Sequence, residues 1–128
     1  MTEAFDRFFM RMALREAEKA AADGEVPTGC VIVEPAPLAG GGEGALSGTR
    51  LDVTKEPCPM CAGAIILARV PTVVGGVSDP KRGGGTVFNI FGHPGINHHP
   101  EIVTGVLEAE SLLVLRDFFR KRREEKAE

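Results

Sequence analysis

The sequence predicts a single layered α/β domain that spans residues 1–128. Two observations lead to this fold class. Short apolar runs typical of strands alternate with segments of helical periodicity, and the chain has the length of one ordinary domain. Hydrophobic residues make up 43% of the chain and charged residues 26%, as in most globular proteins, and no internal repeat divides it.

The first half of the chain predicts one helix, one strand and a long linker. Apolar residues recur at helical spacing from Thr2 to Ala22, and Asp23-Gly24 ends this helix because glycine suits a helix terminus. A short apolar strand follows at Thr28–Val33. Residues 34–50 contain two prolines and five glycines with little hydrophobic periodicity, so we expect a linker there.

The second half predicts further strands and helices around two loops. Glycine and basic residues make residues 78–85 a loop, and prolines with a glycine make residues 93–100 irregular. The regular elements are predicted as a strand at Leu51–Thr54, a helix at Cys58–Ala68, a strand at Thr72–Val77, a strand at Glu101–Leu107 and a helix at Glu108–Lys126.

The charge pattern gives no general attraction to nucleic acid or membranes. The net charge is −3, so a charged partner must be held by local groups. No apolar run approaches the roughly 20 residues of a membrane span, and the acidic start Met1–Ala4 does not resemble a secretory signal. We therefore expect a cytoplasmic protein. The run Arg120–Arg123 is either a solvated helix end or, with Lys81 and Arg82, a patch that contacts phosphates.

Cys58 and Cys61 are the residues most suggestive of chemistry. Three positions apart in a first helical turn, they point the same way, and the helix N-terminus favours the thiolate that binds metal ions. The pair predicts a zinc site, although a redox pair or simple packing also fits a CxxC motif taken alone. We expect Cys30 to be a buried strand residue and not a third ligand. The histidines at 93, 98 and 99 are expected in a solvent-exposed loop.

The residues around the cysteines resemble those of bacterial tRNA-specific adenosine deaminases, which belong to the cytidine-deaminase-like superfamily. The resemblance covers residues 11–33 and 51–123 in family order. It implies a three-layer αβα fold, one zinc ion and a homodimer that acts on the wobble adenosine of a tRNA anticodon loop. The segments that carry the resemblance are Gly24–Val33, Glu56–Ile65, Ser78–Lys81, Gly95–His98 and Asp117–Arg120.

The resemblance also implies roles for individual residues. Cys58 and Cys61 would bind zinc, and eight further residues would bind or surround the RNA. Glu56 and Pro57 would shape the pocket through the backbone. The remaining positions are Pro27 and Thr28 beside the flipped base, Asp79 and Lys81 in a loop that meets the RNA backbone, Asn97 near the RNA, and Phe119 in the helix beside the anticodon loop.

The sequence departs from the family at one segment. The family carries an H-A-E motif, which holds a zinc-ligand histidine and a proton-shuttling glutamate, on a helix before the cysteine motif. The corresponding interval here is 34–50, which has no histidine and whose acids are Glu34 and Glu43. The catalytic residues are therefore unassigned, and one strand and the H-A-E helix are predicted to be missing. Asp52 and Gly75 also stand where the family favours an aromatic residue, which suggests a relaxed site.

Two functions of different classes follow. One is zinc-dependent hydrolysis of tRNA adenosine to inosine, in which a partner chain or a residue such as Glu43 supplies what this segment lacks. The other is a catalytically inactive remnant, arising from a natural or engineered deletion, that binds RNA, a partner or a metal ion as a dimer. We also expect an exposed sheet face and edge that oligomerisation would cover.

Overall fold

The computed structural model describes residues 3–34, 46 and 48–127. Four strands form one sheet in the order β1–β2–β3–β4. Strand β1 is antiparallel to β2, whereas β2, β3 and β4 are parallel to one another. The elements in chain order are α1 (Glu3–Ala22), β1 (Cys30–Val33), β2 (Arg50–Lys55), α2 (Pro59–Leu67), β3 (Thr72–Val77), β4 (Glu101–Val103) and α3 (Glu108–Ala127).

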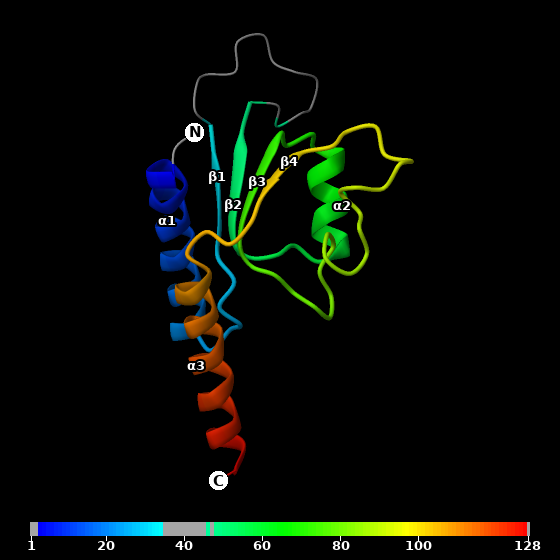
Figure 1. Ribbon diagram of the computed structural model, residues 1–128. Coiled ribbons are helices and arrows are strands. Elements are labelled where there is room, and N and C mark those ends of the chain that lie inside the picture. Colours follow the sequence, from blue (N-terminus) through cyan, green and yellow to red (C-terminus); the bar gives the residue numbers. More distant parts are fainter. Residues whose placement is uncertain (1–2, 35–45, 47, 128) are drawn as a thin grey trace.

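The helices cover both faces of the sheet and confirm the three-layer αβα expectation. Figure 1 shows α1 and α3 on one face and α2 on the other. Side chains of β2 alternate between these two layers, because successive residues of a strand point to opposite faces. No helix in the described ranges is long and apolar enough to cross a membrane.

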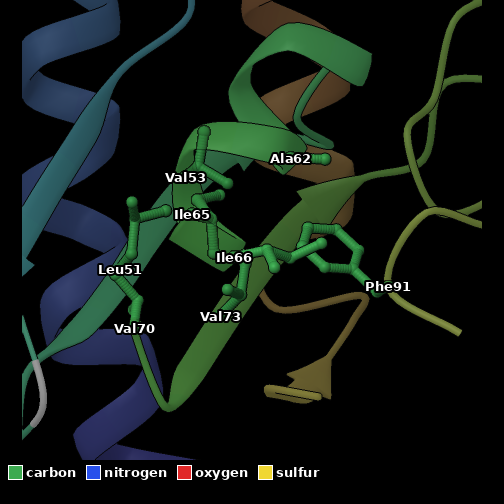
Figure 2. Close-up of a cluster of buried hydrophobic side chains, with 8 residues drawn as sticks. All are labelled: Leu51, Val53, Ala62, Ile65, Ile66, Val70, Val73 and Phe91. Atoms are coloured by element: carbon green, nitrogen blue, oxygen red, sulfur yellow. The ribbon is translucent and has the colours of Figure 1, made fainter. Parts of the chain in front are cut away.

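The larger hydrophobic core lies between the sheet and α2 (Figure 2). Ala62, Ile65 and Ile66 of α2 are buried against Leu51 and Val53 of β2. Burial of an aliphatic side chain of this size stabilises a fold by roughly 1.5–3 kcal/mol. This cluster therefore fixes α2. With it the cluster fixes residues 56–61, which lead from β2 into the first turn of the helix and are called the cysteine turn below. Its other buried members are Val70, Val73 and Phe91.

A smaller cluster joins α1 to the opposite face of the sheet. It contains Met10 and Ala13 of α1 and Val74 of β3, all 0% exposed. The chain enters β1 directly against α1 at Gly29, where an added Cβ would meet the carbonyl oxygen of Ala13. The absence of a side chain at Gly29 therefore permits the close approach of the strand to the helix.

Several element boundaries differ from the prediction. Strand β1 begins at Cys30 and not Thr28, and Arg50, predicted as the end of the linker, begins β2. The last strand ends at Val103 and does not reach Leu107, because Gly105 and Leu107 adopt φ values of 78° and 51° and turn the chain. Of the predicted linker, residues 35–45 and 47 lie outside the described residues, and the described ones before Arg50 belong to no helix or strand.

Strand β1 lies at the edge of the sheet formed by the described residues. Its register places Cys30 opposite Val53 and Ile32 opposite Leu51, so these side chains share the face that α2 covers. Ile32 is nevertheless 53% exposed. The expected exposure of apolar surface is thus observed on this strand, because α2 packs over β2 and β3 and no described helix covers this face of β1.

Candidate functional site

The cysteine pair lies where β2 passes into α2. Cys58 is the N-cap of α2, and Pro59 begins the helix, where its missing N–H requires no partner. Cys58 is half-buried and Cys61, in the first turn, is exposed. The predicted placement of both cysteines at a helix N-terminus is therefore the observed one.

The two thiols differ in acidity. The backbone N–H of Cys61 is the main cause that lowers the pKa of Cys58, and the N–H of Met60 adds to it. The pKa of Cys61 is raised, first by burial and then by the neighbouring Cys58. The helix N-terminus thus favours the thiolate at Cys58 alone and not at both cysteines as expected.

Cys30 does not behave as the sequence predicted, because the residue is exposed. The edge position of β1 explains this, since no helix of the described chain covers the strand there. Burial of the sulfur among its neighbours, followed by the charges of Asp52 and Cys61, raises the pKa of the Cys30 thiol to about 11. These surroundings favour the thiol form of Cys30 over its thiolate.

Among the described residues, Cys58 and Cys61 are the pair that could hold a metal ion, and no third side chain joins them. Among them, no group of three His, Cys, Asp or Glu side chains is placed to hold a metal ion. The loop histidines are engaged elsewhere: His98 Nε2 lies 2.8 Å from the Val70 carbonyl oxygen, and His99 Nδ1 lies 3.0 Å from that of Phe91. His98 is thus partly buried and hydrogen-bonded, so the prediction of a solvent-exposed histidine is wrong for this residue. Two cysteines would supply half of a four-coordinate zinc centre, whereas a hydrolytic centre needs three protein ligands.

Glu56 connects the cysteine turn to the loop that follows β3. Its carboxylate accepts hydrogen bonds from the backbone N–H groups of Asp79, Gly85 and Thr86, at 2.8, 3.1 and 2.6 Å. The Glu56 side chain therefore holds this loop against the residues that lead into α2, whereas the pocket-shaping role of its backbone, which the resemblance implied, stays a prediction. The glycine run at 83–85 was the sequence signal that could have indicated this contact, because a loop without side chains can lie close to a neighbouring turn.

Most of the predicted RNA-binding residues lie at one end of the sheet. Strands β2 and β3 end there, and the antiparallel β1 begins there after the buried Pro27 and the exposed Thr28. Gly29 N donates to Thr54 Oγ1 at 3.0 Å, which fixes this entry beside the end of β2. Pro57, Asp79 and Lys81 follow the ends of the two parallel strands.

Helix α3 also extends past this end of the sheet (Figure 1). Phe119 is 42% exposed on its C-terminal half. Arg122, in the predicted basic run, donates to the carbonyl oxygen of Gly24 at 2.6 Å and lies over the Phe118 ring. This arginine therefore anchors α3 to the connection that leads into Thr28, which is a structural role that the sequence did not reveal.

Asn97 is separated from the other predicted RNA-binding residues. It is exposed, and the adjacent His98 is fixed to Val70, which follows the C-terminal end of α2. Cys58 lies at the opposite end of that helix. Over nine residues a helix extends about 13 Å, so the structure does not bring Asn97 to the cysteine pair.

Comparison with known proteins identifies the family of the chain. Residues 39–123 match the model of the MafB19-like deaminase family. The tRNA-specific adenosine deaminase of Bacillus subtilis is 40% identical over 149 residues, covering 94% of this chain and 92% of the relative. The chain belongs to the tRNA-specific adenosine deaminase family. The corresponding Haemophilus influenzae deaminase is 38% identical, with 95% of this chain and 87% of that protein covered.

Solved structures of deaminases share the fold. A structure from a study of A-to-I editing by tRNA:A34 deaminases has a TM-score of 0.76 and 32% identity, covering 84% of this chain and 99% of that one. A Thermotoga maritima deaminase/reductase has a TM-score of 0.70 and 27% identity, covering 96% of this chain and 42% of that one. The Bacillus alignment is longer than this chain, so that family member has residues with no counterpart here.

Proposed function

We propose that this chain acts on tRNA as a zinc-dependent adenosine deaminase, converting adenosine to inosine at the wobble position of the anticodon loop. The observation that carries the proposal is the Cys58–Cys61 pair at the N-terminus of α2, with a thiolate favoured at Cys58. The relatives named tRNA-specific adenosine deaminases support the substrate class. A tRNA substrate implies action in the cytoplasm.

Zinc would be held by Cys58 and Cys61. When bound in such sites it supplies an activated water molecule for hydrolysis. The remaining ligand and a proton-transferring carboxylate have to come from beyond the described residues of one chain. A partner chain could supply both, and Glu43, which lies outside the described residues, is a candidate for the carboxylate alone. The predicted roles of Thr28, Asp79, Lys81 and Phe119 are to bind the RNA around this site.

A homodimer is part of the proposal, and α2 offers a surface for it. Met60, Gly63, Ala64 and Leu67 recur at helical spacing and form the outer stripe of α2. Met60 is 79% exposed and Leu67 is 85% exposed, and nothing lies within 4 Å of a Cβ built on Gly63. The small central residues would let the same stripe of a second copy approach closely about a twofold axis.

Binding without catalysis is the second candidate function. It is favoured by the lack of a third metal-binding side chain near the cysteines among the described residues. In this case the chain would bind the anticodon loop, with or without zinc, and would release no inosine. Affinity for RNA would weaken with salt, because phosphate contacts release counterions.

One experiment separates the two candidates. The purified full chain is washed with chelator and reloaded with zinc, and zinc per chain and inosine formed in tRNA are both measured by mass spectrometry. Deamination predicts about one zinc per chain and inosine that disappears in Cys58→Ala but persists in the matched control Cys30→Ala. Bound RNA without inosine would refute deamination and leave the binding function. Half an equivalent of zinc would indicate an ion shared by two chains.

A further inference from the structure

The Glu56 carboxylate is the point at which three backbone N–H groups of one loop converge. Asp79 and Thr86 lie at the two ends of the loop segment 79–86, and both donate to this side chain. Gly85 donates to the same oxygen, Oε1, as Thr86. Hydrogen bonds from N–H groups to a carboxylate are about twice as strong as neutral ones. A single side chain from the cysteine turn therefore closes the loop.

The loop is packed directly onto the cysteine turn. Gly84 N donates to the Pro57 carbonyl oxygen at 2.8 Å. A Cβ added to Gly84 would lie 2.7 Å from Cβ of Ala62 and 3.0 Å from the Pro57 oxygen. One added to Gly83 would collide with the Glu56 carboxylate. The loop thus has one tightly constrained position relative to the start of α2.

The same contacts reach the basic residues of the loop. The Asp79 N–H is bound to Glu56, and the Asp79 carboxylate in turn accepts from the N–H groups of Lys81 and Arg82 at 3.0 Å each. Both basic side chains are exposed. Through Asp79, Glu56 is therefore linked to the stretch of backbone from which these two exposed cationic side chains extend.

We infer that Glu56 is a positioning residue that holds the cationic Asp79–Thr86 loop in register with the cysteine turn, so that RNA bound at Lys81 presents its base to that turn. This inference rests on the proposed action on RNA. Glutamine has the same shape but directs an N–H₂ group at one of three N–H donors, so the Glu56→Gln loop loses at least one hydrogen bond.

Amide hydrogen exchange measured by NMR tests the positioning in the full chain. In Glu56→Gln we expect the amides of Asp79, Gly85 and Thr86 to exchange about tenfold faster or more. Each hydrogen bond to the carboxylate stabilises the closed loop by more than a factor of about ten, and its loss removes that protection. The amide of Thr54, which is bound to the Gly29 carbonyl oxygen in the sheet, should keep its rate. Glu110→Gln, an exposed change on α3, is the matched control.

A double-mutant cycle with Lys81→Ala tests the consequence for RNA. Affinity for an anticodon stem-loop is measured for the wild type, Glu56→Gln, Lys81→Ala and the double variant. If Glu56 acts by placing Lys81, the loss caused by Lys81→Ala shrinks at least several-fold in the Glu56→Gln background. A variant that merely lowered overall stability would leave the two losses additive.

The outcomes separate this inference from the proposed function. Faster exchange at the three amides together with non-additive losses supports the positioning role. Unchanged exchange, or additive losses in RNA affinity, overturns it. Faster exchange in a chain that binds no RNA overturns the proposed function and the RNA-placing role together, while the contact between Glu56 and the loop stands.

Discussion

Arg50 and Asp52 point to the same face of β2 and form a buried ion pair in the layer between the sheet and α1. Arg50 Nε donates to Asp52 Oδ2 at 2.9 Å, and the two side chains are 2% and 0% exposed. Arg50 Nη1 also bonds Asp6 Oδ1 of α1 at 2.8 Å, and its guanidinium lies 4.8 Å from the centroid of the Phe5 ring. Arg50, held in place by Asp52, therefore fastens α1 to the sheet. The sequence interpretation of Asp52 as a sign of a relaxed site is wrong, since its carboxylate is fully engaged in the core.

Removal of Asp52 should be strongly destabilising. Burial raises the pKa of the Asp52 carboxyl, although the Arg50 guanidinium opposes that shift. Asp52→Ala would remove a buried carboxylate that pairs with the buried Arg50 guanidinium, and breaking such a pair typically costs about 3–5 kcal/mol in the free energy of unfolding. Asp117→Ala, which breaks the exposed pair with Arg120, should cost under about 1 kcal/mol. Urea denaturation measures the free energy of unfolding of both variants. Equal losses of stability would contradict the importance of the buried pair.

Asp79 should stabilise the protein in a pH-dependent way. Burial raises its pKa, but the N–H groups of Lys81 and Arg82 and the Lys55 ammonium at 3.4 Å outweigh burial, so the pKa is lowered. A carboxyl whose pKa is lower in the folded state adds stability above its unfolded pKa, about 3.9, and loses it as the pH falls through the folded value.

The comparison with Asp79→Asn measures this effect, because asparagine keeps an acceptor oxygen but has no charge. We expect wild type to be the more stable at pH 7 and the difference to fade below about pH 4. Urea denaturation of both proteins over a pH series measures this difference in stability. A difference that stays constant down to pH 3 would assign the effect to shape and not to charge.

The adjacent glycines of β3 should respond to alanine in opposite directions. A Cβ on Gly75 would have Val103 O at 3.8 Å as its nearest neighbour, and a cavity of about 380 Å³ lies beside this position. Gly75→Ala should therefore stabilise the strand by roughly 0.5–1 kcal/mol. A Cβ on Gly76 would lie 2.5 Å from Thr54 O and 2.8 Å from Ser111 Oγ, and Gly76→Ala should cost about 1–3 kcal/mol.

Thermal unfolding of the two alanine variants provides the measurement, and each serves as the control of the other. The same sign of change at both positions would contradict the packing described for β3. The sequence interpretation of Gly75 as a sign of a relaxed site stays a prediction, and the cavity beside Gly75 is consistent with it.

Local patterns in the sequence predicted most of the elements but not their contacts. Periodicity placed α1, α2 and α3, and the CxxC spacing placed Cys58 at a helix start, because these features depend on neighbouring residues. The exposure of Cys30 depends on which strand lies at the sheet edge, and nothing in the strand itself records that. The hydrogen bonds of the Glu56 carboxylate join residues 23 to 30 positions apart, and the glycine run at 83–85 was their sole local trace in the sequence.

The outer stripe of α2 gives the last prediction. Leu67 is 85% exposed on a helix that contains no charged residue, and such apolar surface is typical of an interface between copies. If two chains pair through this stripe, Leu67→Glu places a carboxylate in the contact, and the variant should be monomeric at concentrations where wild type is dimeric.

Size-exclusion chromatography with light scattering measures both states. Leu113→Glu is the matched control, because Leu113 is also an exposed leucine, 58% accessible, but lies on α3 across the sheet from α2. The control should stay dimeric. If wild type is a monomer that dilution does not change, or if both variants dissociate alike, α2 is not the interface. Zinc measured in the same fractions shows whether pairing and metal binding go together, as a partner-supplied ligand requires.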